Sequence, residues 1–162
     1  MGEHETVKQI DAAFETWQSV CDLKFERVEP DEECEIKITF LHNHDVIICS
    51  YKLNGQKGGT LAHAFFPGQS SICGYIHDSE IWTTQKTVSR DGKYNVFSAA
   101  THELGHALGI HHSYEKDSVM APFSKHGCST ENKHEILSES DKALIQQIYE
   151  KPKTIDMRAD FK

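Results

Sequence analysis

Apolar residues recur at helical spacing in three separate segments of the chain. In the first segment, Ile10, Phe14 and Trp17 lie three or four positions apart, so their side chains share one face of a helix. In the last segment, Ser138 stands three residues before Asp141, an arrangement that resembles a helix N-terminal cap. The segments predicted to be helical are Thr6 to about Val20, Tyr94 to about Gly109, and Ser138 to Glu150.

Between the first two helices the hydrophobic pattern changes to a period of two. Ile36, Ile38 and Phe40 alternate with polar residues from Glu35 to Leu41, which is typical of a half-buried strand. Further strand candidates are Val46 to Cys49, Thr60 to Phe66, and Gly74 to Ile76. Three helices and several strands predict an α+β fold with a mixed, twisted sheet.

The length of the chain suits one domain. A chain of 162 residues can bury a core of its own without disulfides or metals as staples. We place this single domain at residues 1–150 and a polar tail at residues 151–162. The segment from Ser113 to Leu137 contains Pro122 and Gly127 and predicts a long, ordered loop.

The charge balance excludes two classes of partner. Seventeen Lys and Arg residues stand against twenty-five Asp and Glu residues, for a net charge of -8, and no basic run is present. We therefore expect no nucleic-acid partner. No apolar stretch is long enough to span a bilayer, and the first fifteen residues are too polar for a secretion signal.

Five cysteines leave two interpretations open. They suit an oxidising compartment, but an odd number leaves at least one of them unpaired. No CxxC pair is present, which argues against a cysteine zinc site. Buried free thiols and one or two disulfides fit equally well for Cys21, Cys34, Cys49, Cys73 and Cys128.

The stretch THELGHALGIHHSYEKDSVMAP, from Thr101 to Pro122, holds four of the eleven histidines. His102 and His106 are four residues apart on a predicted helix, so both rings can reach one ion. Glu103 is offset around the helix and should stand beside that ion, where a general base belongs. These residue types at this spacing indicate a metal site. A solvated helix that merely carries histidines is the alternative.

A catalytic zinc needs a third protein ligand and an open fourth position. Gly109 can adopt the left-handed conformation that ends a helix and turns the chain back toward the metal. His111 and His112 both follow within reach, and one of them is the third ligand. Met120 is interpreted as an apolar floor beneath the imidazoles, with an ordinary core methionine as the alternative.

The pattern HExxHxxGxxH followed by a methionine in a turn resembles the metzincins, and within them the matrixins, or matrix metalloproteinases. In matrixins the third zinc histidine is followed by serine, as His112 is by Ser113, which favours His112 over His111. Three other stretches also resemble this family: AFETWQSVCDLKF at Ala13 to Phe25, GGTLAHAFFPG at Gly58 to Gly68, and LIQQIY at Leu144 to Tyr149.

The resemblance implies a secreted, monomeric zinc endopeptidase. His102, His106 and His112 would hold the zinc, and Glu103 would be the general base. A protein or peptide substrate would bind as an extended strand along the segment from Thr60 to Phe66. Substrate contacts are implied for Leu61, Ala62 and Ala64, with Ser98 in a side-chain pocket beside the metal.

The chain departs from the family where matrixins carry a second, structural zinc and calcium ions. His63 matches one such ligand, but Tyr75 stands where a second histidine is expected, and Asn54 lies in a loop without aspartate. Glu80 fits a calcium ligand only in part. Two interpretations remain open for His42, His44, Asp45 and His77: they form a different second metal site, or they are exposed loop residues. A disulfide between Cys49 and Cys73 would brace the same region.

Three further departures are visible. Only a handful of polar residues precede the first predicted helix, where matrixins usually have a strand, so either the sheet lacks that strand or the chain has been trimmed. The chain also resembles a catalytic unit without prodomain or hemopexin-like domain. One alternative function is a catalytically inactive metzincin-fold binding module. Another is a nonenzymatic zinc protein whose fourth ligand would be Asp117 or Cys128.

Overall fold

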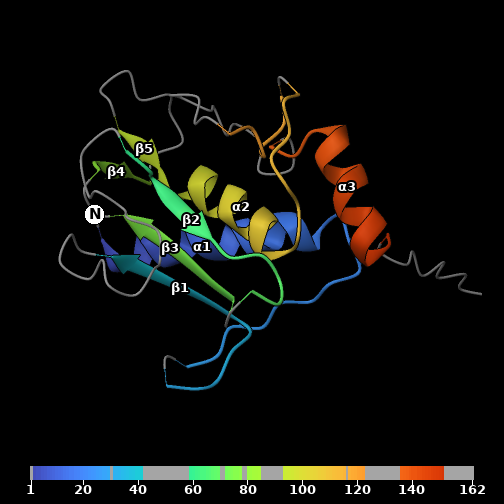
Figure 1. Ribbon diagram of the computed structural model, residues 1–162. Coiled ribbons are helices and arrows are strands. Elements are labelled where there is room, and N and C mark those ends of the chain that lie inside the picture. Colours follow the sequence, from blue (N-terminus) through green and yellow to red (C-terminus); the bar gives the residue numbers. More distant parts are fainter. Residues whose placement is uncertain are drawn as a thin grey trace, which may run out of the picture.

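A computed structural model describes residues 2–29, 31–41, 59–69, 72–77, 80–84, 93–115, 117–122 and 136–151 of the protein. This part of the chain contains three helices, a three-stranded sheet and a separate pair of short strands (Figure 1). None of the described helices combines the length and the apolarity that crossing a membrane requires. The arrangement is the predicted α+β fold.

All three predicted helices are present, with shifted ends. Helix α1 spans Glu3–Gln18 and so begins three residues before the predicted start. Helix α2 spans Val96–Ala107, because Asn95 caps it by accepting a hydrogen bond from the Ser98 N–H at 2.9 Å. Helix α3 spans Glu139–Tyr149.

The predicted cap of α3 is a reciprocal capping box. The Ser138 hydroxyl accepts the Asp141 N–H at 3.1 Å, and the Asp141 carboxylate accepts the Ser138 N–H at 2.9 Å. Two backbone groups that the helix would leave without partners are thereby satisfied. The predicted cap is therefore confirmed, and the helix itself begins one residue after the predicted start.

The sheet is mixed, as predicted, with strand order β1-β3-β2. Strand β1 (Ile36–Leu41) runs parallel to β3 (Ile72–His77), and β2 (Ala62–Ala64) runs antiparallel to β3. Compared with the predictions, β2 is shorter and β3 is longer. The strand predicted for Val46 to Cys49 lies outside the described residues.

A second pair of strands was not predicted. Strand β4 (Trp82–Thr83) pairs in parallel with β5 (Tyr94–Asn95). Two residues are too few to show an alternating pattern in the sequence. Strand β5 also occupies the first two positions of the predicted second helix, which is why α2 begins later than expected.

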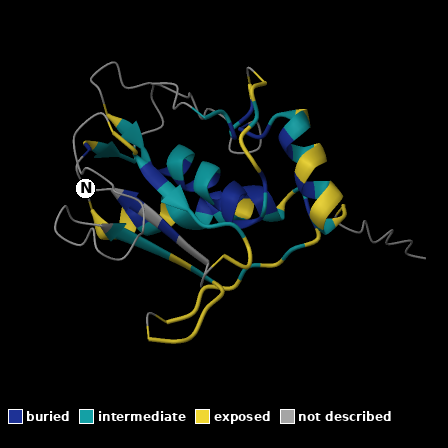
Figure 2. Ribbon diagram, in the orientation of Figure 1, coloured by how far each residue is buried: buried dark blue, intermediate teal, exposed yellow. Residues whose placement is uncertain are grey.

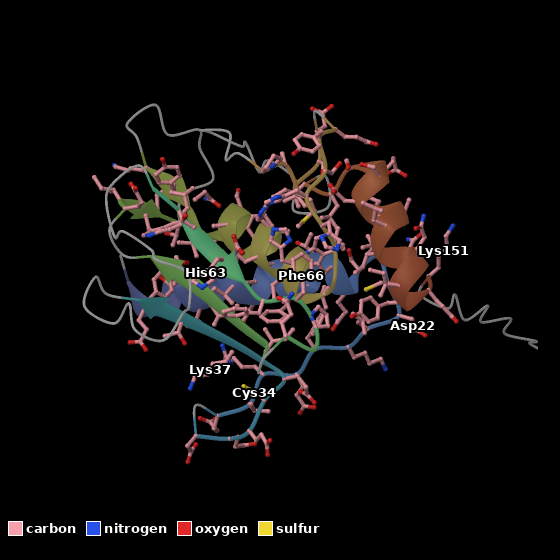
Figure 3. All side chains as sticks on the ribbon, in the orientation of Figure 1. Asp22, Cys34, Lys37, His63, Phe66 and Lys151 are labelled. Carbon is pink, nitrogen blue, oxygen red and sulfur yellow. The ribbon has the colours of Figure 1, made fainter. Side chains whose placement is uncertain are left out.

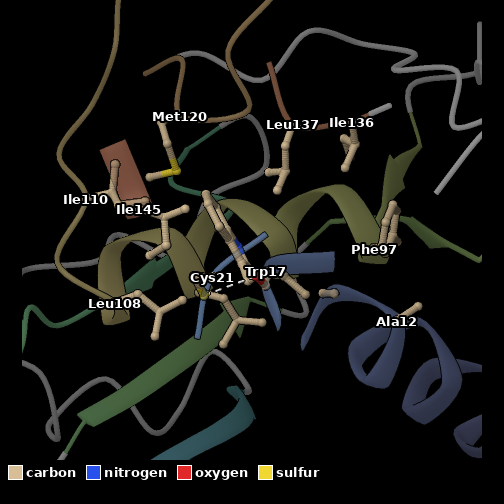
Figure 4. Close-up of a cluster of buried hydrophobic side chains, with 13 residues drawn as sticks. Ala12, Trp17, Cys21, Phe97, Leu108, Ile110, Met120, Ile136, Leu137 and Ile145 are labelled. Atoms are coloured by element: carbon tan, nitrogen blue, oxygen red, sulfur yellow. Dashed lines mark hydrogen bonds between the residues drawn. The ribbon is translucent and has the colours of Figure 1, made fainter. Parts of the chain in front are cut away.

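The core lies between α1, α2 and α3, and Trp17 is its central side chain (Figure 4). Trp17 is fully buried, and its Nε1–H donates a hydrogen bond to the Thr101 carbonyl at 2.8 Å. Exposed positions concentrate on α3 and in the segment that leads to β1, whereas α2 is buried or half-buried along its length (Figure 2). Because α2 is enclosed in this way, the side chains that it carries are held in fixed positions.

Candidate active site

Three imidazole rings meet at the C-terminal half of α2. Each of His102, His106 and His112 offers a ring nitrogen, and these nitrogens all lie within 4.8 Å of one another. The Nε2 atoms of His106 and His112 are 3.1 Å apart. Among the described histidine, cysteine and acidic side chains, these three are the ones grouped closely enough to hold one ion.

Gly109 returns the chain so that His112 reaches the rings on the helix. Its φ of +96° lies in the left-handed region, which side chains other than hydrogen rarely tolerate. The Gly109 N–H donates to the His106 carbonyl at 2.9 Å, and the Ile110 N–H donates to the Gly105 carbonyl at 2.8 Å. These two bonds form a Schellman motif, so the predicted role of Gly109 in ending α2 is confirmed.

Backbone carbonyls fix the proton on two of the rings. His102 Nδ1 lies 2.8 Å from the Val119 carbonyl, and His106 Nδ1 lies 2.8 Å from the Ile110 carbonyl. A carbonyl oxygen only accepts hydrogen bonds, so both Nδ1 atoms carry the proton when the rings are neutral. The Nε2 lone pairs are then free for a metal, which is the outer-shell arrangement found around zinc histidines.

Burial keeps the rings in the uncharged form that binds metals. The pKa of His106 is lowered from 6.5 to about 4, mainly because the ring is removed from water, and the neighbouring His102 and His112 act in the same direction. Burial also lowers the pKa of His102. Both rings are therefore neutral at pH 7, and the donor set fits zinc, which prefers neutral imidazole nitrogen.

Glu103 is half-buried, and one oxygen of its carboxyl is shielded from water. Its Oε2 atom is buried and has no hydrogen-bond partner among the described residues. Burial raises the pKa of this carboxyl from 4.5 to about 8. A buried oxygen without a donor costs about 1–3 kcal/mol, and in the metal-free protein this cost favours the protonated form of the carboxyl.

His111 lies apart from the three rings. It is exposed, and its ring stacks on Phe66 with centroids 4.5 Å apart and an interplanar angle of 28°. Phe66 follows β2 and also contacts His106, at a centroid distance of 5.4 Å (Figure 3). His112, not His111, belongs to the group of nitrogens.

Met120 packs against α2 at Gly105, where the helix has no side chain. Met120 is fully buried. A Cβ on Gly105 would overlap the Met120 Sδ atom and would approach Trp17 Cζ2 to 3.1 Å. Gly105 was not predicted to have a role. A glycine inside a helix costs about 1 kcal/mol relative to alanine, so its presence in the predicted helix could have indicated that another side chain packs closely there.

The turn that carries Met120 is held by residues from α3. Ser113 N–H donates to the Met120 carbonyl at 2.9 Å and closes the loop between them. The fully buried Asp141 accepts hydrogen bonds from Ser118 Oγ at 2.5 Å and from the Val119 N–H at 2.9 Å. The sequence indicated Asp141 only as part of a helix cap. Its contacts with the turn join residues 22 and 23 positions apart, and a local pattern does not reveal contacts over that separation.

The predicted substrate residues lie on β2 and α2. Ala62 is buried and Ala64 is half-buried on β2, which packs against α2, and the half-buried Leu61 lies just before this strand. Ser98 lies one helical turn before His102, and its N–H is bound to the Asn95 side chain in the helix cap. The ring of His63 contacts Phe65 edge to face, at a centroid distance of 5.7 Å.

Most of the residues considered for a second metal site lie outside the described part of the chain. This applies to His42, His44, Asp45, Asn54, Cys49 and Cys128, and to the side chains of Cys73, Tyr75 and His77. Glu80 is buried, and Asp117 is exposed. Cys21 and Cys34 are free thiols.

Comparison with known proteins identifies the family. The matrixin family model matches residues 1–150. The chain belongs to the matrixin family. It is 39% identical to human matrix metalloproteinase-16 over 160 residues, which are 96% of this chain and 25% of that protein. It is 39% identical to human matrix metalloproteinase-25 over 155 residues, which are 91% of this chain and 26% of that protein.

Family membership bears out several predictions made from the sequence. Matrixins are zinc metalloendopeptidases, which are hydrolases, so the predicted resemblance, fold class and enzyme class are confirmed. Matrixins use a catalytic zinc and commonly carry calcium, and the three grouped histidines fit the zinc. The chain spans about a quarter of the length of the curated matrixins it matches.

Proposed function

We propose that the protein is an active zinc endopeptidase that hydrolyses internal peptide bonds of extracellular protein substrates. His102, His106 and His112 hold the ion, and Glu103 is the general base. One observation carries this proposal: three imidazole nitrogens within 4.8 Å of one another lie on and just after the helix that also buries the unpartnered Glu103 oxygen. The catalytic unit comprises residues 1–150 and acts as a monomer.

Zinc, when bound there, supplies a Lewis acid that polarises the scissile carbonyl and lowers the pKa of a coordinated water to about 7. The Glu103 carboxylate would accept a proton from the attacking water as the oxygen of that water adds to the carbonyl carbon. The same carboxyl would then donate the proton to the amine nitrogen as the C–N bond breaks.

The substrate would bind as an added strand on β2. In the described sheet β2 is the terminal strand, paired on one side with β3, so its other side offers backbone groups to a peptide. Backbone contacts would come from Leu61, Ala62 and Ala64. Because backbone pairing carries little sequence choice, selectivity would depend on a pocket beside the metal, with Ser98 in its wall and a preference for apolar side chains.

Two alternatives are less well supported. An inactive binding module would be expected to have lost the base or a ligand, whereas Glu103 and the three histidines are all present. A storage or structural zinc protein would close the fourth position. Within the described residues, no fourth histidine, cysteine or acidic side chain joins the group.

A quenched fluorescent peptide library tests the proposal. We expect the zinc-loaded protein to cleave the library and a zinc chelator to abolish cleavage. Glu103→Ala should lose activity by at least about 10²- to 10⁴-fold while it still binds zinc, because it removes the proton acceptor and leaves the ligands intact. Wild-type turnover in Glu103→Ala would refute the assigned base, and absence of cleavage by any zinc-loaded preparation would refute the enzyme.

A further inference from the structure

We propose that Ser118 is a positioning residue of the metal site, because it connects the carboxylate of Asp141 to the peptide group that orients His102. The inference rests on the proposed function, since it concerns one of the three proposed zinc ligands. Ser118 lies in the turn before Met120, is 6% exposed, and touches none of the three imidazoles in a hydrogen bond.

A continuous chain of hydrogen bonds leads from α3 to His102. Ser118 Oγ donates to Asp141 Oδ1 at 2.5 Å and accepts the Met120 N–H at 3.0 Å. The Met120 nitrogen and the Val119 carbonyl belong to the same peptide group. That carbonyl accepts the proton of His102 Nδ1 at 2.8 Å. The order is therefore carboxylate, hydroxyl, peptide, imidazole.

Burial gives this chain its effect. Asp141 and Met120 are fully buried, and Ser118 is nearly so, which leaves no bulk water to replace a lost bond. Hydrogen bonds in series polarise one another when they lie in a medium of low dielectric constant. When the Asp141 carboxylate holds the Ser118 hydroxyl, the hydrogen bond between the Val119 carbonyl and His102 Nδ1 becomes stronger. The His102 ring is then kept in the orientation that directs its Nε2 lone pair at the metal.

The two oxygens of Asp141 have different tasks. Oδ2 accepts the Val119 N–H at 2.9 Å, the Ser138 N–H at 2.9 Å and the Ser138 hydroxyl at 2.8 Å, so it ties the turn to the start of α3. Oδ1 accepts the Ser118 hydroxyl. A substitution at Ser138 therefore weakens the anchor of α3, whereas a substitution at Ser118 interrupts the path to His102.

His102 needs this support more than His106 does. The Nδ1 of His106 bonds to the Ile110 carbonyl, four residues away at the end of the same helix. The Nδ1 of His102 bonds to Val119, which is 17 residues away on a separate turn. The orientation of His102 thus depends on how firmly that turn is held.

The test compares Ser118→Ala with Ser118→Thr and Ser138→Ala in the full chain. Zinc affinity is measured by competition with a chromophoric chelator, and the His102 Nδ1–H is followed by nitrogen-15 NMR of the zinc-loaded protein. We expect Ser118→Ala to bind zinc about tenfold more weakly, at the lower end of outer-shell effects, and to shift the His102 signal. Ser118→Thr keeps a hydroxyl and should restore both readouts.

Ser138→Ala is the matched control. It removes a half-buried serine hydroxyl from the other oxygen of the same carboxylate and should lower the melting temperature without weakening zinc binding. Wild-type zinc affinity and an unshifted His102 signal in Ser118→Ala would overturn the inference. So would equal losses of affinity in Ser118→Ala and Ser138→Ala. Failure of the wild-type protein to bind zinc would instead overturn the proposed function.

Discussion

Gly105 and Met120 pack so closely that a single added methyl group on the glycine would overlap the sulfur of the methionine. Met120 is fully buried and cannot move into solvent, and Trp17 bounds the same space. The close approach brings the turn that carries Met120 against the C-terminal half of α2, at a position between His102 and His106 in the sequence. The contact thus couples the core to the metal ligands.

Gly105→Ala should therefore destabilise the protein even though alanine favours helices. Overpacking costs about 1–3 kcal/mol, which offsets or exceeds the roughly 1 kcal/mol that alanine gains over glycine in a helix. Urea denaturation measures the free energy of unfolding. Gly74→Ala is the matched control, because its Cβ would meet only Ile38 Cγ1, at an ordinary 3.7 Å. A Gly105→Ala protein more stable than wild type would contradict the packing described.

The metal-free protein should lose stability as the pH rises from 6.5 to 8. Glu103 has a pKa of about 8 in the folded protein and 4.5 as its ordinary value, so over this range the folded state holds a proton that the unfolded state has released. Stability falls wherever the folded state binds more protons, by up to about 1.4 kcal/mol per pH unit for one group. The lowered pKa values of His102 and His106 act in the opposite direction, mainly below about pH 6.5, and offset part of the loss just above it.

Urea denaturation after chelator treatment, at pH 6.5 and pH 8, measures this effect. We expect a loss of about 1–2 kcal/mol for wild type. Glu103→Gln has no proton to lose and should show a much smaller change. Equal pH dependence in the two proteins would show that another group is responsible.

Replacement of the two adjacent histidines should have opposite outcomes. His112→Ala removes a proposed ligand and should weaken zinc binding by more than the about 10- to 100-fold typical of an outer-shell partner. His111→Ala removes a ring that stacks on Phe66 and should retain one tightly bound zinc. Elemental analysis after dialysis against a weak chelator measures the zinc content. Retention of zinc by His112→Ala together with its loss by His111→Ala would reverse the assignment.

Local patterns in the sequence predicted the parts of the site that depend on neighbouring residues. The spacing of His102 and His106 follows from helix geometry, and Gly109 has the conformation that a returning chain requires. The capping box of Ser138 and Asp141 is likewise a local feature. Each of these rests on residues a few positions apart, which is the range over which backbone geometry constrains side chains.

Contacts between distant segments could not be predicted in this way. Nothing in the sequence around Asp141 indicates that its carboxylate also holds Ser118 and Val119, and nothing around Gly105 indicates that Met120 lies against it. These contacts exist because α3 and the turn pack against α2. The short pairing of β4 with β5 was missed for a related reason, since two residues carry no periodicity.

The central claim is a single zinc held by three imidazoles with one position left to solvent. X-ray absorption at the zinc edge of the loaded protein tests it most directly. We predict three imidazole nitrogens and one oxygen at about 2.0–2.1 Å, and two imidazoles in His112→Ala. A sulfur neighbour at about 2.3 Å, or a fourth imidazole, would contradict an open catalytic site.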